Sequence, residues 1–151
     1  MSIQEKIAEV LTKHNLMHIA TIDEQGNPKV RGVDFAVGDQ ENEVYFFTRR
    51  DSNKVRHISN HNRVSIAIDH DCPSMDDLKA LQYIKATGKA ETIETQEEGQ
   101  KAMGLLISKF PFLAEIPGDP KDMVCVKVVM DEIILVDNTL SFGHEETRKY
   151  S

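Results

Sequence analysis

Apolar residues recur at two spacings along this chain, and the spacing predicts where helices and strands form. Near the N-terminus they repeat at helical intervals from Ile3 to Leu11, which predicts an amphipathic helix over residues 2–14. Asn15 is expected to end this helix, because asparagine tolerates the left-handed conformation that is common after a helix. Most of the chain that follows shows the shorter, alternating spacing of β-strands.

The alternating segments predict a mainly-β chain. The segments "LMHIATI" (16–22) and "VRGVDFAV" (30–37) flank Gly26, Asn27 and Pro28, a combination typical of the turn in a β-hairpin. Three further strands are predicted at residues 44–48, 63–69 and 81–93. Residues 124–137 are interpreted as two strands joined by a bend near Asp131 and Glu132.

Two more helices are predicted between these strands. The side chains of residues 51–53 are candidate N-caps for a helix of about two turns that runs to residue 61. Thr95 and Glu98 have the spacing of a capping box, so a helix with an apolar stripe is expected to follow them. The polar or proline-containing stretches 70–79 and 111–122 are predicted to be loops.

Seven strands and three helices without regular β-α-β alternation indicate a mainly-β fold with flanking helices. Several strands, such as "VSIAI", are apolar on both faces. A small β-barrel covered by helices accounts for this, and an open two-layer sheet is the alternative. With 151 residues, of which 40% are hydrophobic, the chain is expected to form one domain over residues 1–151 with a buried core.

Composition narrows the classes of function. The formal charge of −7 disfavours nucleic acid as a partner, because its phosphates would be repelled over most of the surface. No apolar run is long enough to span a membrane, and the N-terminus does not resemble a secretory signal. Cys72 and Cys125 form no CxxC pair, so we expect reduced thiols in a cytoplasmic protein.

Against this acidic background, the segment "YFFTRRDSNKVRH" gathers Arg49, Arg50, Lys54 and Arg56 within eight residues. It follows the order strand, Thr48, polar residues, helix start. The first N–H groups of a helix lack backbone partners and favour anions, so this order is typical of a phosphate site, with Lys54 in the first turn. The alternative is that these residues are solvated surface charge.

Arg31 favours the phosphate hypothesis. It shares one face of its predicted strand with Val33, Phe35 and Val37, which are apolar. An arginine on such a face either reaches water at the end of the strand or has an anionic partner. Asp34 points to the other face, whereas a bound phosphate would serve as that partner.

The segments "IATIDEQGNPKVRGVDF", "VYFFTRRDSNKVRHISNHNRVSIAI" and "YIKATGKAE", in this order, resemble the pyridoxamine 5′-phosphate oxidase-like family of FMN-binding split β-barrels over residues 5–138. The resemblance implies a split β-barrel of six to seven antiparallel strands. It also implies a homodimer that holds FMN in the groove between its subunits.

By the same resemblance, the FMN phosphate is held by Arg31, next to Val33, and by Thr48, Ser52 and Lys54. The backbone of residues 31–34 and of Phe47 borders the isoalloxazine, and Gln82 is the polar residue near the start of the fifth strand. Arg49 and Arg50 fall at positions that vary in the family, and together with Arg56 they are interpreted as surface charge. The residues expected to bind the cofactor are Arg31, Gly32, Val33, Asp34, Phe47, Thr48, Ser52, Asn53, Lys54 and Gln82.

The resemblance predicts an FMN-dependent oxidoreductase that passes electrons between a reductant such as NAD(P)H and a small organic acceptor. The alternatives are a non-catalytic flavin-binding or sensing module and a relative that binds haem or the deazaflavin F420. The C-terminal "SFGHEETRKYS" does not match the substrate-binding segment of true pyridoxamine phosphate oxidases, so vitamin B6 oxidation is not expected. We name no acid-base catalyst, because the flavin supplies the redox chemistry.

Histidines give no convincing metal site. "HDC" (70–72) is interpreted as a polar loop, because adjacent side chains point in alternate directions and no second cluster completes a tetrahedral site. His57 and His61, one helical turn apart, lack a third ligand and are interpreted as part of a solvent-facing helix. His144 is either an ordinary tail residue or one that reaches the flavin across the dimer. We therefore predict no metal.

Overall fold

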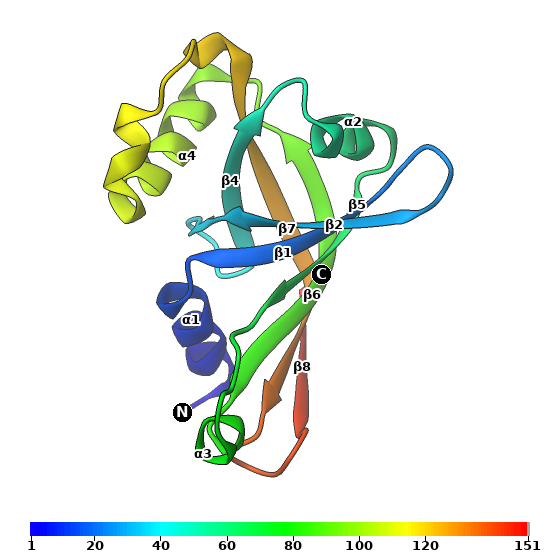
Figure 1. Cartoon of the computed structure of the whole chain (residues 1–151), viewed down its shortest axis with the longest axis vertical. Helices are drawn as coiled ribbons and strands as arrows, with labels where there is room; N and C mark the ends of the chain where they lie inside the picture. The colour runs from blue at the N-terminus through cyan, green and yellow to red at the C-terminus, as the bar shows by residue number, and fades with distance from the viewer. Residues whose placement is uncertain (151) are drawn as a thin grey trace.

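The computed structural model describes residues 1–150, which form one antiparallel sheet of eight strands with helices packed around it (Figure 1). The strands are β1 (Leu16–Ile22), β2 (Pro28–Asp34), β3 (Ala36–Val37), β4 (Glu43–Arg49), β5 (Arg63–Ile68), β6 (Gln82–Thr92), β7 (Met123–Asp137) and β8 (Glu145–Lys149). The helices are α1 (Ile3–Lys13), α2 (Asn53–Asn60), α3 (Met75–Lys79) and α4 (Gln96–Lys109), with 3₁₀ turns η1 (Pro111–Glu115) and η2 (Pro120–Asp122).

The sheet has the order β2-β1-β5-β6-β7-β4-β3 and curls into the half-barrel of a split β-barrel (Figure 1). β7 organises it. Residues 126–137 of β7 pair with the whole of β6, while on its other edge the first half of β7 pairs with β4 and the second half with β8. The predicted barrel with flanking helices is confirmed.

A bulge bends β7 at the predicted place. Thr87 pairs with Glu132 and Gly88 with Met130, so Asp131 is an extra residue that the facing strand β6 does not match. The bend near Asp131 is therefore confirmed, but residues 124–137 lie within one continuous strand rather than two. Gly88 is required there, because a Cβ atom would lie 2.2 Å from the carbonyl oxygen of Val129.

Hydrophobic packing covers the inner face of the sheet, and α4 also covers the outer face over β3, β4 and β7. In β5, which was predicted to be apolar on both faces, exposed and buried residues alternate. Inside the barrel, buried side chains such as Ile19, Ile84 and Leu135 pack with the apolar stripe of α1. On the outer face, α4 packs Leu106 and Phe110 against Tyr45, Cys125 and neighbouring residues. The predicted strand alternation is clearest in β6, where Ile84, Ala86, Gly88 and Ala90 are buried and the residues between them are exposed.

Several local predictions were wrong. Helix α1 begins with the capping box of Ser2 and Glu5 but ends at an extended His14, and no non-glycine residue in 1–150 is left-handed, so Asn15 is not a left-handed cap. The predicted strand 30–37 is interrupted at Phe35, whose N–H donates to the carbonyl oxygen of Asn15.

The predicted capping box at Thr95 does not form, since no side chain caps α4. The loop 70–79 contains the short helix α3, which begins because the Ser74 hydroxyl accepts the N–H of Asp77. The C-terminal β8 was not predicted. Among residues 1–150, no helix has the length and apolarity that crossing a membrane requires.

Candidate functional site

The predicted basic cluster divides into cations that have carboxylate partners and one that has none. Arg49 pairs with Asp51 at 3.0 Å, Arg50 with Glu94 at 3.2 Å and Arg56 with Glu24 at 2.6 Å. Lys54 has no carboxylate within 4 Å among residues 1–150, and neither does Arg31 on β2. Of Arg31 and the four cations of the cluster, the two predicted to hold a phosphate are therefore the two without a counter-ion among residues 1–150.

Lys54 and Arg31 also lie partly out of water. Burial lowers the pKa of Lys54, and the nearby positive charge of Arg31 lowers it further. Burial alone lowers the pKa of Arg31. Two like charges held close together in a half-buried place are stabilised by an anion that contacts both of them.

Helix α2 begins beside these cations with its first turn open. Ser52 is the N-cap residue, yet its side chain does not cap the helix. Its hydroxyl instead lies 3.5 Å from that of the buried Thr48 at the end of β4. The first N–H groups of α2 thus have neither helical nor side-chain partners, and with two hydroxyls they form donors suited to a phosphate.

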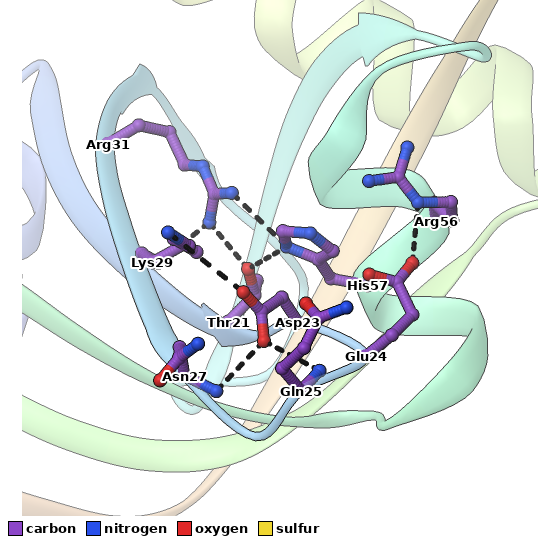
Figure 2. A network of polar contacts seen from close by, with 9 residues as sticks. All are labelled: Thr21, Asp23, Glu24, Gln25, Asn27, Lys29, Arg31, Arg56 and His57. Carbon is purple, nitrogen blue, oxygen red and sulfur yellow. Dashed lines mark hydrogen bonds and ion pairs between the residues drawn. The ribbon is translucent and has the colours of Figure 1, made fainter.

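Arg31 is held by the side chains of Thr21 and His57, neither of which was predicted to belong to this site (Figure 2). Its Nη1 donates to Thr21 Oγ1 at 2.6 Å and to the carbonyl oxygen of Lys29 at 2.9 Å, and its Nη2 lies 3.5 Å from His57 Nδ1. Thr21 Oγ1 and His57 Nδ1 are 2.9 Å apart. The partners of Arg31 within the chain are therefore a hydroxyl, a backbone carbonyl and an imidazole nitrogen, not a carboxylate.

Arginine only donates, so Thr21 Oγ1 accepts from Arg31, and the Arg31 Nη2 that faces His57 Nδ1 favours the tautomer with the ring proton on Nε2. In this tautomer the Thr21 hydroxyl donates to His57 Nδ1. His57 Nδ1 is thus an acceptor that faces both the hydroxyl and the guanidinium. His57 is buried, so the expectation that it lies on a solvent-facing side of the helix was wrong.

Contacts at the tip of the β1–β2 hairpin connect this group to α2 (Figure 2). Glu24 pairs with Arg56 on α2 at 2.6 Å. The Asp23 carboxylate accepts the N–H groups of Gln25 and Asn27, each at 2.9 Å, and the bond from Asn27 is the main reason that the pKa of Asp23 is lowered. The turn is therefore ordered, and it sets the position of β2 relative to the helix that carries Lys54.

The other predicted residues lie in different surroundings. On β2, Val33 is half-buried while Gly32 and Asp34 are exposed. Asn53 accepts a hydrogen bond from Arg56 at 2.9 Å. Gln82 lies far from α2. The end of β6 near α2 is marked by Ala90, whose N–H donates to the carbonyl oxygen of Asn62 just after the helix. Gln82 is eight strand residues away from Ala90, which corresponds to about 26 Å.

Instead of the phosphate site, Gln82 contacts a buried acid, donating to Asp137 at 3.1 Å. One chain therefore brings together Arg31, Thr48, Ser52 and Lys54, but not Gln82.

Phe47 points away from Thr48 and lines a cleft of about 670 Å³ between α4, the η1–η2 segment and the sheet. The lining is mostly apolar, with Arg50 and Glu94 among its polar residues. Cys125 also lines it, and burial raises the pKa of this thiol to about 11. Cys72 and Cys125 are both free.

The histidines form no metal site among residues 1–150, where no group of three or more potential ligands is close enough together. His70 stacks on His14 with ring centroids 5.5 Å apart. His144 lies in the turn before β8, where its Nε2 is 3.1 Å from a carboxylate oxygen of Glu146.

Comparisons with known proteins agree with this fold. The sequence model of the pyridoxamine 5′-phosphate oxidase family matches residues 3–137. No curated protein sequence matches the chain.

Several solved structures are similar to the chain. A haem-binding protein from Mycobacterium smegmatis has a TM-score of 0.79 and 18% identity, with 99% of this chain and 58% of that chain covered, so this chain spans little more than half of that protein. The conserved protein Rv2991 from Mycobacterium tuberculosis has a TM-score of 0.76 and 22% identity, covering 95% and 90%. HutZ, the haem storage protein from Vibrio cholerae, has a TM-score of 0.72 and 18% identity, covering 86% and 91%.

Proposed function

The chain belongs to the pyridoxamine 5′-phosphate oxidase family, and on that premise we propose that it is an FMN-binding flavoprotein. The observation that carries the proposal is the pair of cations, Arg31 and Lys54, which are partly buried, close together and without a carboxylate partner in residues 1–150. A phosphate monoester supplies the missing negative charge.

The neighbouring donors fit the same group. Ser52 and Thr48 offer hydroxyls, and the open first turn of α2 offers backbone N–H groups. Hydrogen bonds to charged groups contribute roughly 1.5–3 kcal/mol each, so a few of them are sufficient for a dissociation constant of about 1 μM or lower. We therefore assign Arg31, Thr48, Ser52 and Lys54 to the phosphate.

We further propose a homodimer with FMN between its subunits. β2 is an edge strand of the sheet, and its Val30 is 69% exposed; Leu16, on the same face of β1 but four register positions further along, opposite Asp34, is also exposed. An apolar surface on an unpaired strand is suited to contact with a second copy. In this arrangement the exposed residues Gly32 and Asp34 border the flavin from one subunit, and the partner completes the groove.

The activity we propose is electron transfer between a reductant such as NAD(P)H and a small organic acceptor. FMN, when bound, would supply this redox chemistry, because its ring can accept a hydride and pass electrons on to an acceptor. The chain's own residues hold the phosphate and leave the ring accessible. None of them needs to transfer a proton.

The test is a titration of purified, flavin-free protein with FMN, followed by absorption and flavin fluorescence. We expect Lys54→Ala to weaken binding by about 10- to 100-fold, the loss of one charge-assisted contact. Arg49→Ala is the matched control, because Arg49 is exposed and pairs only with Asp51 nearby. Wild-type protein that ignores FMN at high micromolar concentration would rule out the cofactor.

Turnover is tested separately. Oxidation of NAD(P)H by the FMN-loaded protein in the presence of a quinone or nitroaromatic acceptor supports the oxidoreductase. Tight FMN binding without any oxidation of NAD(P)H supports a flavin-binding module instead.

Haem binding is the second candidate, favoured by the likeness to two proteins whose names state haem binding or storage. Haem carries propionate groups, which the same two cations can also pair with. Titration with haemin separates the candidates, because binding to the protein shifts and sharpens the Soret band of free haemin. A protein that binds haemin tightly and FMN not at all would replace the first proposal by the second.

A further inference from the structure

We propose that Thr21 and His57 are positioning residues, which direct the Arg31 guanidinium toward the phosphate and thereby make the protein prefer phosphorylated over unphosphorylated flavin. The inference rests on the proposed function, because it concerns the same site. It adds two residues, on β1 and α2, that belong to none of the predicted binding positions.

Contacts within the chain use three of the five N–H groups of Arg31. A guanidinium has five N–H groups. Nη1 directs its two at Thr21 Oγ1 and the Lys29 carbonyl oxygen, and Nη2 directs one at His57 Nδ1. The Nε–H and one Nη2–H have no acceptor among residues 1–150, so two N–H groups of a fixed, planar fork remain for the two oxygens of an anion.

Burial holds the two supporting side chains in place. Thr21 is fully buried and His57 is 4% exposed, so neither turns freely toward solvent. Thr21 comes from the strand that pairs with β2, and His57 from the helix that carries Lys54. The contacts of Arg31 therefore fix its direction relative to both the hairpin and the helix (Figure 2).

The supporting residues leave the positive charge of Arg31 without a counter-ion. Because His57 Nδ1 accepts a hydrogen bond, it supports a cation without neutralising it. A carboxylate in its place would pair with Arg31 and compete with the phosphate. The chain thus holds a partly buried arginine in one direction and keeps its full charge for a ligand.

The experiment compares FMN with riboflavin, which has the same ring without the phosphate. Thr21→Val and His57→Phe remove the two polar atoms with little change in size. Thr21→Ser and His57→Asn are the matched controls, because serine keeps the hydroxyl and the asparagine side chain places a polar atom near the position of Nδ1. Dissociation constants are measured by flavin fluorescence, and folding by circular dichroism and thermal melting without ligand.

We expect Thr21→Val and His57→Phe to weaken FMN binding about tenfold, the loss of roughly one well-directed hydrogen bond, while riboflavin binding stays the same. The two control variants are expected to stay within about threefold of wild type. Equal losses for FMN and riboflavin would overturn the proposal, since they indicate general damage to the fold. Unchanged FMN binding by a folded His57→Phe protein would overturn it as well.

A double substitution tests whether His57 acts through Arg31. In the Arg31→Ala background, His57→Phe should cause no further loss of FMN affinity, because the residue that it positions is gone. A further loss comparable to that in the wild-type background would show a direct or a general structural role. This comparison remains informative if Thr21→Val fails to fold.

Titration with inorganic phosphate separates failure of this inference from failure of the proposed function. If wild type binds phosphate but not FMN, the FMN proposal fails, and the effect of His57→Phe on phosphate affinity still decides the role of His57. If wild type binds neither, both proposals are overturned.

Discussion

Arg31 and Lys54 repel one another across two different elements, and this repulsion adds to burial in lowering the pKa of Lys54. Bound phosphate acts in the opposite direction and raises that pKa. By linkage, FMN affinity is full while Lys54 is protonated in the free protein and declines as the pH rises through its lowered pKa. Because this pKa lies below the ordinary value of 10.5, the decline begins at a lower pH than for an ordinary lysine.

The measurement is the dissociation constant of FMN from about pH 7 to pH 10.5, with riboflavin as the control for ionisation of the ring. Lys54→Arg is expected to move the decline beyond the upper end of this range, because arginine stays protonated there. Equal pH profiles for FMN and riboflavin in the wild-type protein would contradict the assignment of Lys54.

A buried ion pair between α1 and β7 makes a stability prediction. Asp137 is 0% exposed, and Lys6 reaches it at 2.8 Å. Burial alone would raise the pKa of Asp137, but hydrogen bonds from Lys6, Thr139 and Gln82 outweigh it and lower the pKa. Its contribution to stability is therefore present at neutral pH and lost as the pH falls through the lowered, folded-state pKa.

Lys6→Met leaves this carboxylate buried without its counter-ion and is expected to lower the free energy of unfolding by about 3 kcal/mol. The comparison is Lys13→Met, which breaks an exposed pair with Glu9 on the same helix and should cost at most about 0.5 kcal/mol. Urea unfolding at pH 7 measures both. Equal effects of the two substitutions would contradict the importance of the buried pair.

Glycine positions 88 and 104 should respond in opposite ways to alanine. At Gly88 a Cβ atom would lie 2.2 Å from the Val129 carbonyl oxygen, so Gly88→Ala forces β6 and β7 apart and should cost about 2 kcal/mol or more. At Gly104, within α4, a Cβ atom meets nothing within 4 Å, so Gly104→Ala should stabilise by about 0.5–1 kcal/mol. Thermal melting measures both changes in stability. If Gly88→Ala left the stability unchanged, the strands would have to separate easily at the bulge.

The proposed dimer makes a prediction at the edge strand. Val30→Asp places a charge on the exposed apolar surface of β2 and is expected to weaken self-association at least tenfold, because an interface would bury that charge unpaired. Phe142→Asp is the control, since Phe142 is more exposed, at 77%, but lies in the turn before β8. Sedimentation velocity over a range of concentrations measures both, and a wild-type protein that stays monomeric would refute the dimer.

The sequence predicted those parts of the fold that depend on local spacing. The hairpin, β5, β6 and the bend in β7 follow from alternation and turn residues, and each lies within a few residues of its predicted bounds. Helix α3 was missed because five residues are too few to show a helical period, and its start depends on one contact, from the Asp77 N–H to the Ser74 hydroxyl. The strand 124–137 was divided in two because a bulge and a turn are alike in sequence.

The candidate site was predictable only in part. Lys54, Ser52 and Thr48 follow from the order of strand and helix, and Arg31 follows from its place on an otherwise apolar strand face; the family resemblance assigned all four to the phosphate. Thr21 was not found, because its place depends on the register of the hairpin, in which it lies diagonally from Arg31 on one face. His57 was missed because a two-turn helix does not reveal its buried face without the sheet against which it packs.

The position of β7 in the sheet has a consequence for biosynthesis. β4 pairs with β7 across more than half the length of the chain, and β6 pairs with it along its whole length. When residues 1–122 have left the ribosome, β4 and β6 therefore each still present an open edge, next to apolar side chains that the finished barrel encloses. Closure depends on residues that are synthesised after both partner strands, so the open edges of β4 and β6 are available for aggregation until β7 has emerged.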